Sequence, residues 1–165
     1  MILFLRGNFG AFFVFLHIFI FVVPMISFET KNVDMPQLDF TKVEIWLGEV
    51  AANYSKKIRN LNYLFCDDNE ILRVNREFLR HDYFTDIITF DYSGRDKVGG
   101  DLFISIETVK SNAEELNVPF TQELLRVIVH GLLHLCGIDD KAPGEREIME
   151  NHENEALKLW NQLNG

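Results

Sequence analysis

One apolar segment in the C-terminal third of the chain limits most strongly how the chain can fold. It reads LLRVIVHGLLHLCG from Leu124 to Gly137. Apolar side chains would cover nearly every side of a helix with this sequence, so the helix must be buried in the core of a domain. We expect it to span 122–136, with Thr121 as its N-terminal cap and Gly137 as the residue that ends it.

Two histidines interrupt this apolar helix. His130 and His134 are four residues apart, so they project from the same face one turn apart. Two imidazoles at this spacing can bind one metal ion. Gly137 then lets the chain turn, and Asp140 follows His134 by six residues. The pattern H-x3-H-x2-G-x2-D predicts a metal site with His130, His134 and Asp140 as ligands and an open position for water.

Other residues compete with Asp140 for the third ligand position, because an aspartate after a helix is often only a turn residue. Asp139 and His152 are the two alternatives. Cys136 is disfavoured, because two residues from His134 on a helix it points to nearly the opposite side.

The first residues of the chain differ in composition from the rest. Residues 9–24 form an apolar run behind Arg6, the only charged side chain before Met25. A cleaved signal peptide, a retained membrane anchor and an upstream start codon with translation truly beginning at Met25 all fit this run. We favour the third, because no small-residue cleavage site separates the run from the strand that starts at Met25. The chain is then an apolar extension, 1–24, and a single domain, 25–165.

The sequence of this domain predicts an α+β fold, in which helices pack on a small mixed sheet and a buried helix with its following turn carries the metal site. Apolar runs rich in Ile and Phe predict strands, and a turn over 94–100 predicts an antiparallel hairpin. The expected strands cover 25–30, 61–66, 86–92 and 101–105, and the expected helices cover 40–54, 68–80, 107–116, 122–136 and 144–163.

Composition and charge narrow the functional classes. The 165 residues are 47% hydrophobic and 25% charged, with a formal net charge of −9. This balance argues against coating of nucleic acid or of an anionic membrane, so any contact with nucleic acid must be local. The two cysteines are too few for a disulfide framework and fit a reducing compartment. We therefore expect a cytoplasmic domain that does not bind a membrane.

Three motifs resemble those of a known family. The segment His130–Asp140, HGLLHLCGIDD, resembles the signature H-G-x-L-H-L-x-G-Y-D-H of the YbeY endoribonucleases, which are bacterial factors of ribosomal RNA maturation. Residues 74–90 resemble the family's L-N-x-x-Y-R-x-x-D-x-x-T-D-V-L-S-F block, and Gly100–Ile104 resembles its G-D-I-x-I strand. The resemblance extends from Met25 to the C-terminal helix.

The resemblance implies a function. The chain would be a single-strand-specific, metal-dependent endoribonuclease that acts in rRNA processing, including maturation of the 3′ end of 16S rRNA, and in ribosome quality control. His130, His134 and Asp140 would hold one zinc ion, Asp139 would be the general base, and ribosomal RNA and ribosomal particles would be the partners. Two positions depart from the family pattern. Asp140 stands where the family usually has a third histidine, and Leu79 stands where it usually has a phosphate-binding arginine.

An arginine stripe could replace the arginine that is missing at position 79. If the segment around it is one α-helix, Arg73, Arg76 and Arg80 lie on one face and could pair with RNA phosphates. The basic segment 56–59 could extend the stripe. In the expected mechanism a bound ion activates water and polarises a phosphoryl oxygen, while an arginine neutralises the developing charge.

Two other functions remain as alternatives. The first is a secreted metalloprotease that uses the N-terminal run as a signal peptide. Gly131 argues against it, because H-E-x-x-H proteases carry their general base, a glutamate, at that position. The second is a non-catalytic ribosome-assembly factor with a structural metal, which would bind ribosomal particles without cleaving RNA.

Overall fold

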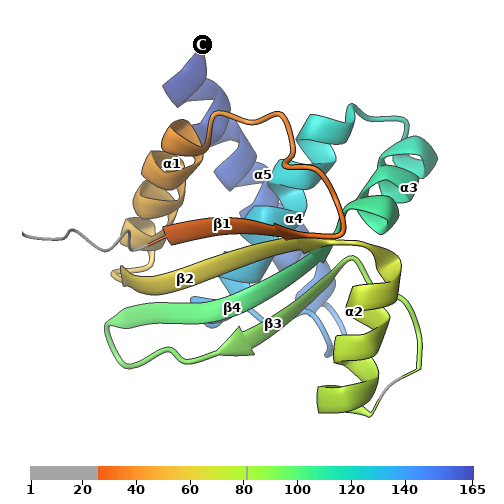
Figure 1. The fold of residues 1–165 in the computed structure, drawn as a ribbon. Coiled ribbons are helices and arrows are strands. Elements are labelled where there is room, and N and C mark those ends of the chain that lie inside the picture. Colours follow the sequence, from red (N-terminus) through yellow and green to blue (C-terminus); the bar gives the residue numbers. More distant parts are fainter. Residues whose placement is uncertain (1–25, 81) are drawn as a thin grey trace, which may run out of the picture.

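The computed structural model describes residues 26–80 and 82–165, so the proposed N-terminal extension lies outside the described residues. Strands and helices follow one another along this part of the chain (Figure 1). The elements are β1 (Ile26–Lys31), α1 (Phe40–Asn53), β2 (Lys57–Cys66), α2 (Asp68–Val74), a π-helical turn (Asn75–Leu79), β3 (Ile87–Asp91), β4 (Lys97–Ser105), α3 (Ile106–Leu116), α4 (Phe120–Leu135) and α5 (Glu145–Asn164).

The four strands form one mixed sheet in the order β1-β2-β4-β3. β2 pairs in parallel with both β1 and β4, whereas β3 and β4 form the expected antiparallel hairpin. In Figure 1, α1, α4 and α5 lie behind the sheet and α2 lies in front of it. The predicted α+β fold with helices packed on a small mixed sheet is confirmed.

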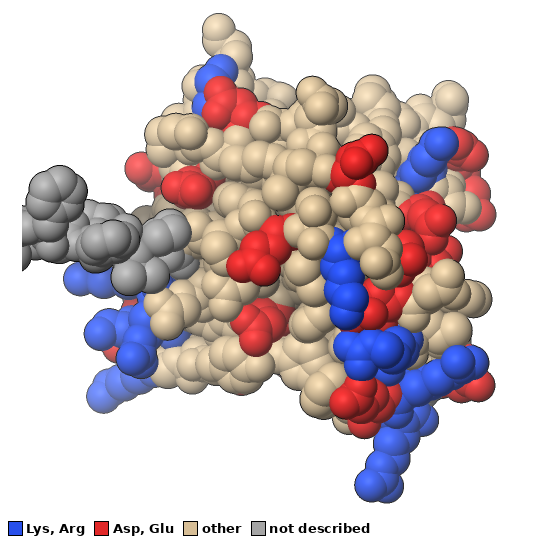
Figure 2. All heavy atoms as spheres, viewed as in Figure 1, with Lys and Arg blue, Asp and Glu red and all other residues tan. Residues whose placement is uncertain are grey.

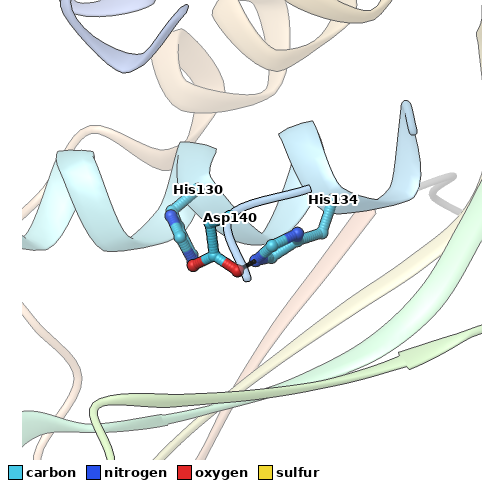
Figure 3. Close-up of side chains that lie close together, drawn as sticks. All are labelled: His130, His134 and Asp140. Carbon is cyan, nitrogen blue, oxygen red and sulfur yellow. Dashed lines mark ion pairs between the residues drawn. The ribbon is translucent and has the colours of Figure 1, made fainter. Parts of the chain in front are cut away.

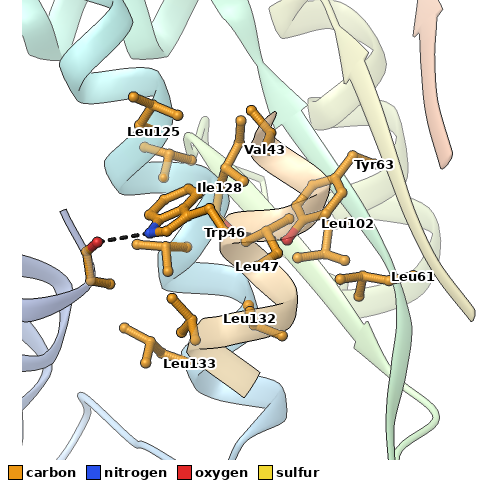
Figure 4. Packing of buried hydrophobic residues seen from close by; sticks show 14 of the residues in the cluster. Val43, Trp46, Leu47, Leu61, Tyr63, Leu102, Leu125, Ile128, Leu132 and Leu133 are labelled. Atoms are coloured by element: carbon orange, nitrogen blue, oxygen red, sulfur yellow. Dashed lines mark hydrogen bonds between the residues drawn. The ribbon is translucent and has the colours of Figure 1, made fainter. Parts of the chain in front are cut away.

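The main core lies between the sheet and the helices behind it. Alternate residues of β2, among them Leu61 and Tyr63, are fully buried on this side, as the two-residue period of a strand requires. Figure 4 shows them facing side chains of α1 and α4. The Tyr63 hydroxyl donates a hydrogen bond of 3.1 Å to the carbonyl of Ile128, so this large residue is buried without an unpaired polar atom.

Helix α4 is buried as its sequence predicts, but it begins at Phe120. The expected cap at Thr121 is wrong. Pro119 is the N-cap, makes no side-chain cap bond, and accepts the backbone N–H groups of Gln122 and Glu123 at its carbonyl. Its extended backbone, with ψ of 138°, sets where the helix can start.

The expected α-helix over 68–80 is wrong beyond Val74. The chain widens there into a π-helical turn and ends at Arg80 with a left-handed φ of 58°. The side chain of Asn75 is 1% exposed and donates to the carbonyl of Tyr83 at 2.8 Å. This bond connects the end of the helix to the loop that follows it. Helical periodicity in the sequence cannot predict such a contact, because it forms only in the folded chain.

Strands β2 and β4 begin four residues earlier than expected, at Lys57 and Lys97. Polar residues at their start hide the strand pattern, although Ile58 and Val98 are buried in the core. None of the helices within 26–80 and 82–165 is long and apolar enough to cross a membrane.

Candidate metal centre

His130, His134 and Asp140 come together at the C-terminal half of α4. Figure 3 shows both imidazoles projecting from one side of the helix, with the carboxylate of Asp140 reaching them from the following loop. Each Nε2 atom lies 3.8 Å from an oxygen of Asp140, and one donor atom from each residue lies within 4.8 Å of the others. The structure thus brings together the three residues that the H-x3-H-x2-G-x2-D pattern singled out.

The turn after α4 returns the chain to the histidines. Gly137 has a φ of 97°, a conformation that favours glycine, and ends the helix as predicted. The backbone N–H of Ile138 bonds the carbonyl of Leu133, which reverses the chain and places Asp140 beside the imidazoles. The carbonyl of Ile138 lies 2.8 Å from Nδ1 of His134. One turn therefore positions two of the three residues.

A carboxylate from another helix fixes the remaining histidine. Glu153 of α5 lies 2.8 Å from Nδ1 of His130, and its other oxygen accepts a bond of 2.8 Å from Arg126. The Nδ1 atoms of both histidines are therefore engaged, which leaves each Nε2 directed at Asp140. Ligating histidines in proteins are held in this way by a partner at the other ring nitrogen.

Sequence reasoning missed Glu153. The signal that could have found it is its position, because Met149, Glu153 and Ala156 recur at helical spacing and form the buried stripe of α5. A carboxylate on a buried stripe needs a cationic or hydrogen-bonding partner. The partner itself lies 23 residues away in sequence.

The two imidazoles differ electrostatically. Burial lowers the pKa of His130, but the hydrogen bond and charge of Glu153 outweigh it, so the pKa lies above its ordinary value. Burial and then the neighbouring His130 lower the pKa of His134. Burial raises the pKa of Glu153, but the bonds from His130 and Arg126 outweigh it, so this carboxyl has a lowered pKa. Glu153 is therefore a charged partner for His130 at neutral pH.

The donor set fits a divalent cation. Two imidazole nitrogens and one carboxylate oxygen are ligands that zinc accepts, with a further position left for water. The carboxylate also makes the site harder than one built from three histidines. The three donors lie on one side of α4 and converge on a common point (Figure 3).

A groove of about 760 Å³ opens beside this cluster. His130 and Asp140 form part of its wall, and α3, α4 and α5 supply most of the remainder. Its lining mixes carboxylates such as Asp86 with the cations Arg126 and Arg146. A substrate segment could lie here while its reacting group is at the imidazoles.

The two other residues considered as third ligand lie differently. Asp139 is exposed and is adjacent in sequence to Asp140. His152 has its Nδ1 atom 2.8 Å from the hydroxyl of Tyr54, in a separate pocket between α1 and α5. In 26–80 and 82–165, the only group of ligating side chains that could hold a metal ion consists of His130, His134 and Asp140.

The arginines predicted to bind RNA do not lie on one regular α-helix, because α2 ends at Val74. Arg73 pairs with Glu70 and Glu77, and Arg76 pairs with Asp82 at 2.6 Å. The helix packs on Ile88 and Phe103, on the face of the sheet opposite to α4. The predicted one-face arrangement assumed an α-helix over 68–80, which the π-helical turn interrupts. A role of these arginines in RNA binding stays a prediction.

Gly131 has a structural reason to lack a side chain. A Cβ atom there would overlap Cδ2 of Leu102 and would lie 2.8 Å from Cδ1 of Ile87, so any larger residue would have to displace these two side chains of the sheet. The position faces the sheet. H-E-x-x-H proteases carry their glutamate at this position, where this chain packs a glycine against the sheet.

Known proteins are similar to this chain over most of its length. The family model described as Endoribonuclease YbeY matches residues 25–161. A protein named Endoribonuclease YbeY from Phocaeicola vulgatus is 57% identical over 82% of this chain and 98% of its own length. One of the same name from Bacteroides thetaiotaomicron is 52% identical over 81% of this chain and 98% of its own length.

A solved structure resembles the whole fold. The solution structure of TM1509 from Thermotoga maritima aligns with a TM-score of 0.54 and 26% identity, covering 84% of this chain and 93% of the other. The match to the family model and the identity to the curated relatives both extend over most of the described residues. The chain belongs to the YbeY endoribonuclease family.

Proposed function

We propose that this protein is a metal-dependent endoribonuclease that cleaves single-stranded RNA in rRNA processing, including maturation of the 3′ end of 16S rRNA, and in ribosome quality control. Membership of the YbeY family supports the reaction class. The observation that carries the proposal is the convergence of His130, His134 and Asp140 within 4.8 Å beside an open groove. Ribosomal RNA and ribosomal particles in the cytoplasm are the proposed partners.

His130, His134 and Asp140 are the proposed ligands of one zinc ion per chain. Their donor atoms suit zinc, and the bonds at both Nδ1 atoms leave the Nε2 atoms available. When bound, the ion supplies a Lewis acid that activates water near neutral pH and polarises a phosphoryl oxygen. Glu153 keeps the ring of His130 in the orientation that ligation needs.

Asp139 is the proposed general base. It is exposed next to the cluster, and no hydrogen bond from a described residue engages its carboxylate. A carboxylate in this state can accept the proton that water loses on attack of the phosphodiester. Arg126 faces the groove from α4, whereas Arg73, Arg76 and Arg80 are proposed contacts to phosphates farther along the RNA.

The alternatives explain less. A metalloprotease of the H-E-x-x-H class needs a glutamate at position 131, where this chain has a glycine packed against Leu102 and Ile87. A non-catalytic assembly factor with a structural metal would need the three ligands but not the groove beside them.

Cleavage of a labelled single-stranded RNA by the purified full chain tests the proposal. The wild type, treated with a chelator and then supplied with zinc, should regain activity. His130→Ala should lose at least about 100-fold, because one of three ligands is gone. His152→Ala is the matched control, because that histidine contacts Tyr54 in another pocket, and it should cleave like the wild type. RNA that binds to every variant but is cut by none would instead favour an assembly factor.

A further inference from the structure

Five basic side chains gather where β2 and β4 begin. This hairpin-end cluster consists of Lys56, Lys57, Arg59, Arg95 and Lys97. Figure 2 shows a basic group at this end of the exposed sheet face, and a second one over α2 at the other end. The segment 56–59 therefore does not extend the arginines of α2. Four of the five side chains are exposed, and Lys56 is half-buried.

The cations of the cluster lack ion-pair partners, although Asp96 lies between Arg95 and Lys97 in the chain. None of its five cations forms an ion pair with a carboxylate of the described residues, which include every Asp and Glu of the chain. Lys56 instead donates to the backbone carbonyl of Arg95 at 3.0 Å. By contrast, Arg73, Arg76 and Arg126 are all paired. In an acidic chain with 25 Asp and Glu, five of the 16 Lys and Arg thus gather at one place without an ion pair to a carboxylate.

Two lysines of the cluster face each other across strands. Lys57 is directly paired with Lys97 in the sheet register. Because their neighbours Ile58 and Val98 point into the core, both lysines point to the opposite, exposed face. Like charges in directly opposed positions destabilise a sheet unless an anion lies between them. The arrangement therefore suits an anionic partner.

An exposed aromatic ring lies on the same hairpin. Tyr92 is 66% exposed, and its backbone N–H bonds the carbonyl of Gly99 at 2.9 Å. Its hydroxyl donates to Asp101 at 3.0 Å, and Asp101 in turn accepts a bond of 2.7 Å from Asn62. The ring is thus held in place while its surface stays open. Cations combined with exposed aromatic rings are the usual means of binding single-stranded nucleic acid.

The cluster and the candidate metal centre are connected through strand β4 but lie on opposite faces of the sheet. Leu135, the residue after His134, packs against Gly100 from the α4 side, where an added Cβ would lie 3.3 Å from its methyl carbons. Lys97 is three residues from Gly100 on β4, which corresponds to about 10 Å along the strand, and it points to the other face. An RNA chain that contacts both places would pass around β3, the edge strand of the sheet.

We infer that the hairpin-end cluster and Tyr92 form a binding surface for single-stranded RNA that flanks the scissile phosphate. The lysines and arginines contact phosphates, and the ring of Tyr92 stacks on a base. The inference rests on the proposed function for the identity of its ligand. It also explains how a chain with a net charge of −9 holds a polyanion, since the positive charge is concentrated locally.

A charge-matched pair of triple variants tests the inference. The first is Lys57→Gln, Arg59→Gln and Lys97→Gln in the full chain. The control is Lys42→Gln, Lys110→Gln and Lys158→Gln, which removes the same charge from exposed positions on α1, α3 and α5. The probe is a labelled oligo-uridine of about 16 nucleotides, and the affinity is measured over a range of salt concentrations.

The hairpin-end variant should bind the oligo-uridine about 10-fold more weakly at low salt, and the slope of log Kd against log salt should fall by about 2. Its unfolding midpoint should not fall, because a like-charge pair is removed. The control should keep both the affinity and the slope. Tyr92→Leu should weaken binding by at least about 5-fold without changing the slope, whereas Tyr92→Phe keeps the ring and should bind like the wild type.

Two outcomes would overturn the inference. One is that the hairpin-end variant binds the oligo-uridine as the control does. The other is that it keeps RNA affinity but loses binding to poly-glutamate, which would make the surface a site for an acidic protein. Cleavage by the wild type is assayed separately. A wild type that binds RNA through the cluster yet cuts none would contradict the proposed function and leave the inference standing.

Discussion

At the scale of single residues, Glu153 connects His130 of the candidate metal centre to Arg126 on the same helix. It is 6% exposed and lies between an imidazole and a guanidinium, both at 2.8 Å. Removing one partner of such a buried group leaves the other uncompensated. Glu153 therefore orients the ring of His130 so that Nε2 faces Asp140, although Glu153 is not one of the three candidate ligands.

We predict that Glu153→Ala weakens zinc binding by about 10- to 100-fold, because the ring of His130 loses the partner that orients it. Competition with a chromophoric chelator measures the affinity. Glu153→Gln, which keeps an acceptor for Nδ1, should restore part of it. Glu155→Gln on the exposed side of α5 is the control and should match the wild type. Equal zinc affinities for Glu153→Ala and the control would show that Glu153 does not position His130 for zinc binding.

The sequence reveals some of these residues and hides others for a physical reason. His130 and His134 share a helix face through local geometry, so their spacing alone predicts their proximity. The turn at Gly137 adds Asp140 over a short distance. Glu153 comes from another helix, and the packing angle of α5 on α4 decides what it meets. That angle is a tertiary property, which no spacing within one element encodes.

At the scale of elements, α2 shows where helical periodicity stops being informative. Asp67 caps the helix, and Ile71 and Val74, three residues apart, are buried on one face. The break after Val74 depends on Asn75, whose bond to Tyr83 is formed only in the folded chain. The sequence places the starts of β2 and β4 too late for a similar reason. Their first residues, Lys57 and Lys97, are polar and pair with each other, so the apolar pattern of the core does not extend to them.

A buried carboxylate in α2, that of Glu70, provides a test of stability. Glu70 is 6% exposed and accepts bonds from Arg73 at 2.7 and 3.1 Å and an ion pair from Lys31 at 3.1 Å. The bond from Arg73 lowers the pKa of Glu70, against the opposing effect of burial. Because the charged form is favoured in the folded state, its contribution is present above the ordinary pKa and is lost as the pH falls through the lowered value.

Glu70→Gln should therefore lower the free energy of unfolding by about 1.5 kcal/mol at neutral pH, and by less in acid, where the wild type also loses the charge. Denaturant unfolding at the two pH values measures both differences. Glu77→Gln removes an exposed carboxylate from the same arginine and should change stability by no more than about 0.5 kcal/mol. A loss for Glu70→Gln that is the same at both pH values would contradict the assignment of the charge.

At the scale of the whole molecule, docking of α5 on α1 holds the candidate site together. The indole N–H of Trp46 donates to the carbonyl of Ala156 at 2.7 Å (Figure 4). The ring of Trp46 meets that of Trp160 edge to face, with 5.3 Å between the ring centroids. Ala156 lies one turn from Glu153 on the same helix. The fold class followed from the order of expected elements, whereas the strand order β1-β2-β4-β3 depends on long-range pairing that the sequence pattern does not contain.

Trp46→Phe should lower the free energy of unfolding by about 2 kcal/mol, because the buried hydrogen bond is lost and the smaller ring fills less of the core. Denaturant unfolding followed by circular dichroism measures the change. Trp160→Phe, at a half-buried position, is the comparison and should cost less. A larger loss for Trp160→Phe would mean that the edge-to-face contact, and not the bond to Ala156, secures α5.

RNA cleavage, as proposed, depends on a metal held by His130, His134 and Asp140. Elemental analysis of the purified protein measures this metal, with the wild type beside His134→Ala, Asp140→Ala and Asp139→Ala. We predict one zinc per chain in the wild type and in Asp139→Ala, and loss of the metal from the other two. Stoichiometric zinc in Asp140→Ala, or no metal in the wild type, would disprove this ligand set.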